Sequence, residues 1–165
     1  NYFSQNTKHT WVSRFLILRK FMITLILLNF IVSITMLSII MVTQIVSYPL
    51  FLNVNEEFTS YHSEYVKKIT IIVIPVMIIE LALTIMLYYM LDGFLSLIFL
   101  ISLILIFMST VFIQVPIHNK LKFNYDQYLI KKLIKTNWLR TFLWSTKTIV
   151  CYSIFVKELS WTSLL

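Results

Sequence analysis

Ionisable side chains are rare in the apolar stretches of this 165-residue chain, and those that occur there are candidates for chemistry. Glu80 is the one charged residue between positions 69 and 91, and Arg140 and Lys147 lie in the last apolar stretch. A charge at the centre of a bilayer costs about 2.5–3.5 kcal/mol, so it needs a partner. Lys147 lies about 15 Å along a helix from Asn137, a depth comparable to that of Glu80. We therefore expect a Glu80–Lys147 ion pair, with Arg140 one level nearer the membrane face.

Glu80 has two interpretations. It either belongs to a structural ion pair with Lys147 or Arg140, or it serves as a proton relay or catalytic acid/base. In the catalytic interpretation Glu80 and Lys147 handle a proton, and Arg140 stabilises a developing anion. His118 completes this candidate catalytic set.

Two histidines, His62 and His118, are expected at the same membrane face on neighbouring helices. Imidazole is a common metal ligand and also handles protons near neutral pH. The pair is therefore a candidate metal or haem ligand set, or a proton-handling pair. The alternative is two interfacial histidines that bond to loop carbonyls, since no His-Glu-x-x-His spacing supports a metal. The residues identify no cofactor.

Most of the other polar residues of the apolar stretches also converge on this face. An up-down helix order places there the end of the first helix, the start of the second, the end of the third and the start of the fourth. These side chains either bind a ligand or form inter-helix hydrogen bonds, each worth about 0.6–2 kcal/mol. In a binding site, His62, His118 and Asn119 form the mouth, and Gln44 and Gln114 orient the ligand. The full ligand-binding set is Gln44, Tyr48, His62, Gln114, Asn119, Asn137 and Trp138.

The elements that carry these residues are helices long enough to span a membrane. Hydrophobic residues make up 59% of the chain, charged residues 13%, and the mean hydropathy is +0.84. About 20 apolar residues cross a bilayer, and alternating β-barrel patterns are absent. We predict one all-α membrane domain over 1–165, an antiparallel up-down bundle of four transmembrane helices. A polar, basic loop at 118–137 is expected to hold a short interfacial amphipathic helix. The predicted spans are 21–48 (ending before Pro49), 66–91, 95–117 and 138–156.

Composition also excludes several classes of protein. One Gly excludes glycine-rich nucleotide loops, and one Cys, Cys151, excludes an internal disulfide or an iron–sulfur site. The net charge of +7 comes from Lys and Arg near the predicted helix ends, where anionic headgroups attract them. We expect the lipid bilayer, and not nucleic acid, as the partner, with a homo-oligomer or a larger membrane complex also open.

Five short runs of the sequence are distinctive. They are Thr43–Phe51, Tyr61–His62, Ile74–Met77 with Glu80, Gln114–Leu121, and Asn137–Thr141 with Trp144. These runs resemble one group of small bacterial membrane proteins, the four-helix family related to the anthrone-oxygenase-like domain. The resemblance covers about residues 20–155 and implies an integral protein of the bacterial inner membrane. Fungal anthrone oxygenases insert oxygen into polyketide anthrones without a dedicated cofactor, so the resemblance implies an oxygenase-like activity if the chain is an enzyme.

Two functional hypotheses follow. In the first, a polar intramembrane pocket binds or oxidises a hydrophobic quinone-like or phenolic molecule. In the second, the chain is a non-catalytic accessory subunit of a larger membrane complex, and the polar set joins its helices. A small transporter is a third, weaker hypothesis, because no pair of broken helices is visible in the sequence.

Overall fold

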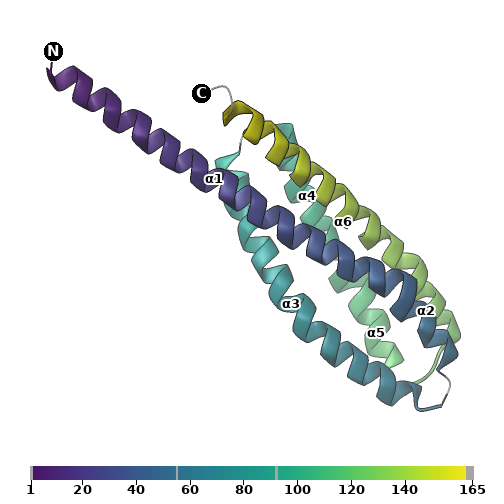
Figure 1. Cartoon of the computed structure of the whole chain (residues 1–165). Coiled ribbons are helices and arrows are strands. Elements are labelled where there is room, and N and C mark those ends of the chain that lie inside the picture. Colours follow the sequence, from purple (N-terminus) through teal and green to yellow (C-terminus); the bar gives the residue numbers. More distant parts are fainter. Residues whose placement is uncertain (1, 55, 92, 163–165) are drawn as a thin grey trace.

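The computed structural model describes residues 2–54, 56–91 and 93–162, with side chains for 13–54, 56–91 and 93–160. Every regular element in these ranges is helical, which confirms the all-α prediction. The helices join end to end into four rods that pack side by side (Figure 1).

The first rod is a continuous helix that changes type near its end. It consists of α1 (Tyr2–Val42), the π-helical turn η1 (Thr43–Ser47), α2 (Tyr48–Leu50) and the 3₁₀ turn η2 (Phe51–Asn53). The prediction that helix ends before Pro49 is wrong. The amide of Tyr48 donates to the carbonyl of Thr43, five residues back. Pro49 therefore falls in the first turn of α2, where a missing N–H is tolerated.

The third rod repeats this arrangement. It consists of α4 (Phe94–Ser109), the π-helical turn η3 (Thr110–Gln114) and α5 (Val115–Leu121), with Pro116 in the first turn of α5. The expected span 95–117 lies within it. The hydroxyl groups of Thr43 and Thr110, which open the two π turns, each donate to a carbonyl four residues earlier at 2.8 Å. Such turns are frequent at functional sites because they re-aim side chains.

The second rod is α3 (Phe58–Met90), which contains the expected span 66–91 up to its last residue and continues through Pro75. The turn to α4 includes Gly93, whose φ of 117° is a conformation that favours glycine. Asp92, which the sequence places in the same turn, lies outside the described residues.

The fourth rod, α6 (Gln127–Thr162), corrects the prediction of a separate amphipathic helix inside a loop at 118–137. Helix α5 extends to Leu121, and the non-helical connection covers only residues 122–126. The carboxylate of Asp126 accepts from the Leu129 amide at 3.0 Å and so caps the start of α6. Ile130 and Leu133 are fully buried in the bundle. The apolar face of this amphipathic stretch therefore packs against the other helices. The expected span 138–156 is a later part of the same helix.

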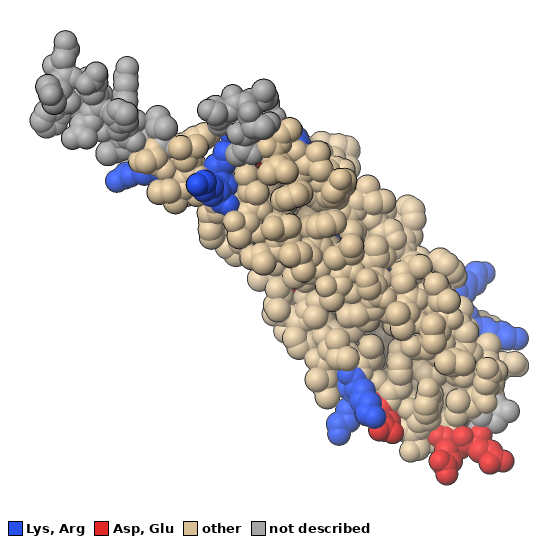
Figure 2. Space-filling view, in the orientation of Figure 1, with Lys and Arg blue, Asp and Glu red and all other residues tan. Residues whose placement is uncertain are grey.

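The distribution of polarity fits a lipid environment. Three stretches, Ser13–Asn53, Phe58–Met90 and Phe94–Leu121, are long and apolar enough to cross a membrane. Glu80 and Lys147 have no exposed surface, whereas apolar side chains are exposed along the outside, as at Ile71 with 66%. This is the reverse of the usual order in water. On the face drawn in Figure 2, the charged side chains lie toward the two ends of the molecule, and the surface between them carries none.

Candidate functional site

A chain of amide and guanidinium groups joins the first rod to α6. Gln44, in the π turn η1, donates to the carbonyl of Ile134 at 3.2 Å and accepts from Asn137 at 2.9 Å. Asn137 in turn accepts from Arg140 at 3.2 Å. The structure thus brings together Gln44, Asn137 and Arg140 as the helix order implies. The nitrogen and the oxygen of the Gln44 amide both form hydrogen bonds to α6, so this side chain joins the first rod to α6.

The two histidines bond to each other and not to loop carbonyls. Nε2 of His62 lies 2.9 Å from Nδ1 of His118, and Nε2 of His118 lies 3.0 Å from the hydroxyl of Tyr48. Nδ1 of His62 is buried and has no hydrogen-bond partner among the described residues. Phe58 stacks on the His62 ring with centroids 5.4 Å apart. The arrangement is a three-residue hydrogen-bonded chain from α3 through α5 to α2.

The hydrogen bond between the two histidines bears on the hypothesis that they bind a metal together. A shared ion would have to sit between the two ring nitrogens that now bond directly to each other. No group of three His, Cys, Asp or Glu residues that could hold a metal occurs in the described part of the chain. The hydrogen-bonded chain through His62 and His118 is an arrangement that could pass a proton.

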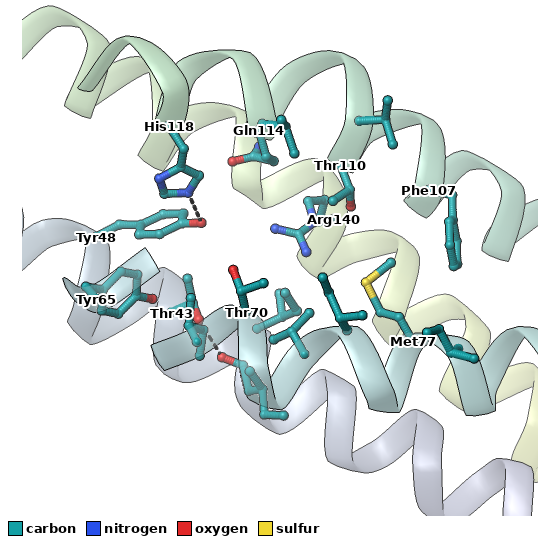
Figure 3. A pocket seen from close by; sticks show the side chains of 18 residues that line it. Thr43, Tyr48, Tyr65, Thr70, Met77, Phe107, Thr110, Gln114, His118 and Arg140 are labelled. Carbon is teal, nitrogen blue, oxygen red and sulfur yellow. Dashed lines mark hydrogen bonds between the residues drawn. The ribbon is translucent and has the colours of Figure 1, made fainter. Parts of the chain in front are cut away.

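A cavity of about 350 Å³ opens beside these residues (Figure 3). Polar side chains gather at one end, and Met77 and Phe107 lie at the other. The walls come from all four rods, with α6 contributing Arg140. The full lining is Ile39, Ile40, Thr43, Tyr48, Tyr65, Ile69, Thr70, Val73, Ile74, Met77, Ile78, Phe107, Thr110, Val111, Gln114, Val115, His118 and Arg140.

Three lining residues present polar atoms with no hydrogen-bond partner within the described structure. They are Nε of Arg140, the hydroxyl of Tyr65 and Oε1 of Gln114. An unpaired buried polar group costs about 1–3 kcal/mol, and more when it is charged. The three groups belong to different rods, and all three residues border the same cavity.

Arg140 also lacks an acidic partner. Its side chain is only 5% exposed. Among the residues that the structure describes, the ion pairs join Lys68 to Glu64 and Lys147 to Glu80. A buried charge without a counter-ion is strongly unfavourable. Arg140 therefore places an uncompensated positive charge at the wall of the cavity.

The predicted ion pair between Glu80 and Lys147 is confirmed. The Lys147 ammonium also donates to Asn29 at 3.3 Å and to Ser33 at 3.2 Å, and lies 3.8 Å from the centre of the Phe99 ring. Neither member of the pair lines the cavity. The pair forms a separate polar network deeper in the bundle, with Oε2 of Glu80 unpartnered among the described residues.

Of the seven predicted ligand-binding residues, Tyr48 and Gln114 line the cavity and the other five do not. Gln44, His62 and Asn137 are buried and bond to other side chains, whereas Asn119 and Trp138 lie on the outside. Asn119 is exposed and Trp138 is 54% exposed, and neither lines the cavity. Each follows an inward-facing residue, His118 or Asn137, and one step along a helix turns a side chain by about 100°. Trp144, in contrast to Trp138, is fully buried.

Sequence reasoning missed the contribution of α3 to the cavity. Tyr65, Ile69, Val73 and Met77 all line it. Their spacing of four residues is the signal that could have found them, because it marks one helix face. The cavity also shares Phe107 and Val111 with a second groove of about 300 Å³. That groove is lined only by apolar residues: Leu81, Leu100, Leu103, Ile104, Phe107, Met108, Val111 and Phe112.

Comparisons of this chain with protein-family models, with curated protein sequences and with solved structures find no match.

Proposed function

We propose that this protein binds the polar head of a hydrophobic small molecule, of the quinone-like or phenolic class, in the cavity beside Arg140. The observation that carries the proposal is the set of unmet polar groups on Arg140, Tyr65 and Gln114 around one apolar-walled space. Sites for small molecules combine apolar walls with a few converging polar groups in this way.

The ligand would enter from the lipid. Ile74 and Ile78 of α3 line the cavity and are 51% and 60% exposed, and Val111 of η3 is 53% exposed. The wall therefore reaches the apolar outside of the bundle between α3 and η3. An apolar substituent of the ligand would continue past Phe107 and Val111 into the second groove.

This function rests on a four-helix antiparallel bundle in the membrane, for which α6 must be the fourth span. The charges that lower its hydropathy point inward, since Arg140 is 5% exposed and Lys147 fully buried. Its outer side carries apolar residues, with Phe142 and Ile149 exposed by 67% and 65%. These orientations support a span over 138–156. The bacterial inner membrane as its location follows from the family resemblance.

Oxidation of the bound molecule is a further part of the proposal and rests on the resemblance to the anthrone-oxygenase-like family. Dioxygen would be the oxidant: it would take two electrons and two protons from a bound hydroquinone-type phenol, giving the quinone and hydrogen peroxide. Arg140 would stabilise a phenolate. Tyr48 lines the cavity and is hydrogen-bonded to His118, which is hydrogen-bonded to His62. These three side chains would carry a proton away from the ligand. Glu80 and Lys147 lie outside the cavity lining, so they support the fold in this proposal.

Binding of a long-chain phenol to the purified protein in detergent tests the proposal. We expect Arg140→Gln to weaken binding about 10- to 100-fold, since a hydrogen bond to a charged group contributes about 1.5–3 kcal/mol. Arg14→Gln is the matched control, because Arg14 is exposed on α1 and does not line the cavity. Equal binding by both variants and the wild type would refute the proposal.

The accessory-subunit hypothesis has its own support in the fully used amide of Gln44, which joins the first rod to α6. An obligate subunit should aggregate in mild detergent or co-purify with stoichiometric partners. A ligand-binding protein that works alone should be monodisperse, as a monomer or homo-oligomer.

A further inference from the structure

We infer that the ligand is an aromatic diol, bound with one oxygen as an acceptor or oxyanion and the other as a hydroxyl donor. This inference rests on the proposed function, because it assigns the head group of the molecule in that same cavity. It separates the quinone-like class from the phenolic class, since a quinone offers only acceptor oxygens and a phenolic hydroxyl also offers a donor.

The acceptor or oxyanion position follows from Arg140 and Tyr65. Nε of Arg140 is a donor only, and the Tyr65 hydroxyl has no partner in the described structure. Arg140 carries a charge that no described acid balances. An oxygen that is ionised, or that accepts strongly, therefore fits between these two groups.

The donor position follows from the orientation of the Gln114 amide. Oγ1 of Thr136 donates its single hydrogen to the carbonyl of Lys132 at 2.9 Å. It must therefore accept from Gln114, whose amide nitrogen lies 3.1 Å away. This assigns the nitrogen of the amide to Thr136 and leaves Oε1 as the unpartnered atom at the cavity.

Gln114 Oε1 can only accept, so it requires a donor from the ligand. A quinone or a simple carboxylate cannot supply one, and a phenol that is ionised at Arg140 has no hydrogen left to donate to Gln114. A neutral phenol hydroxyl both accepts and donates, but it serves both residues only where one oxygen reaches both. A ring with two hydroxyl groups meets the two residues with separate oxygens. The remaining wall is apolar, with Val73, Met77 and Phe107 available to the ring and its substituent.

Binding of probes that share one dodecyl chain tests this assignment. The probes are dodecyl-substituted catechol, hydroquinone, phenol and 1,4-benzoquinone, measured by calorimetry in the same detergent. For wild-type protein we expect the better of the two diols to bind about 3- to 10-fold more tightly than the phenol, the contribution of one additional hydrogen bond. Catechol carries its two hydroxyl groups on adjacent ring carbons and hydroquinone on opposite ones, so the tighter of the two shows which spacing of oxygens the cavity fits.

The variant Gln114→Leu should reduce this diol preference to about 1-fold, and Gln114→Met provides a second variant of similar length. Gln127→Leu is the matched control, because Gln127 is exposed at the start of α6 and lies outside the cavity lining. It should retain the wild-type preference. Comparing the diol-to-phenol affinity ratio of each variant with that of the wild type cancels the different partition of the probes into micelles.

The outcomes separate the two proposals. Equal affinity for diol and phenol in the wild type, or an unchanged preference in both Gln114 variants, overturns the diol assignment and leaves the proposed function standing. Tighter binding of the quinone also overturns it. Failure of all four probes to bind the wild type overturns the proposed function, and the diol assignment with it.

Discussion

Arg140 and Lys147 lie seven residues apart on the inward side of α6, yet only Lys147 meets a carboxylate. Seven residues are about two helical turns, so the two cations point in similar directions at different depths. Glu80 on α3 neutralises the deeper one. The shallower one faces the cavity with no acid beside it among the described residues. One charge therefore stabilises the bundle, and the other is available to a ligand.

The Glu80–Lys147 pair should behave as a coupled unit. Glu80→Gln or Lys147→Met alone should lower the free energy of unfolding by about 3–5 kcal/mol, because each leaves a buried partner unpaired. The double variant should recover part of that loss, measured as a double-mutant cycle from thermal unfolding in detergent. The matched exposed pair, Glu64→Gln with Lys68→Met, should show no measurable coupling. Simple additivity of the Glu80 and Lys147 effects would contradict the pairing.

Replacing the other buried cation of α6, Arg140, by Met should change the stability of the protein in the opposite direction to Lys147→Met. Arg140→Met removes a buried charge that has no acidic partner among the described residues, so the ligand-free protein should gain about 1–2 kcal/mol, after the loss of the hydrogen bonds to Asn137 and Tyr48. Lys147→Met should be destabilising in the same thermal assay. A loss of stability in Arg140→Met comparable to that in Lys147→Met would show that Arg140 has a partner within the fold.

The groove beyond Phe107 and Val111 should bind the apolar chain of the ligand. Ile104 lines this groove and is not a lining residue of the cavity, so Ile104→Trp should fill part of the groove. It should weaken binding of a dodecyl-substituted phenol about 10-fold and leave a methyl-substituted phenol unchanged, since each buried CH₂ contributes about 0.8 kcal/mol. Ile101→Trp is the control, because Ile101 is 45% exposed on α4 and lies outside the groove lining. Equal effects of the two tryptophans on the long chain would place the chain elsewhere.

The histidine pair should work without a metal. Metal analysis and an ultraviolet–visible spectrum of protein purified from native membranes should show no stoichiometric metal and no haem absorption, because His62 and His118 bond to each other. His118→Phe should weaken phenol binding less than Arg140→Gln does, since His118 reaches the ligand through Tyr48. A stoichiometric metal that is lost in His118→Phe would reassign both rings as ligands.

Much of the polar cluster could be predicted from chain order and helical spacing. The ends of the first and third helices and the starts of the second and fourth meet, as Gln44 with Asn137 and His62 with His118 show. The connection through 118–137 could not be predicted in the same way. A basic amphipathic stretch fits both an interfacial helix and the first turns of a longer one. Ile130 and Leu133 are buried against the bundle, and these tertiary contacts make the stretch from residue 127 the first turns of the longer helix α6.

Amino-acid sequence alone determined the helical class, the apolar stretches and the Glu80–Lys147 pair. The reason is that an apolar solvent leaves backbone groups no partner outside a helix, and leaves an acid no partner but a cation at its own depth. Only the tertiary structure decided which side chains border the cavity. The π turns at Thr43–Ser47 and Thr110–Gln114 add residues to a turn, so helical spacing counted in the sequence loses its register there. Contacts across the bundle then set which polar atoms have a hydrogen-bond partner, as both ends of the Gln44 amide do. They also set which atoms of cavity-lining residues have none within the described structure, as for Nε of Arg140 and Oε1 of Gln114.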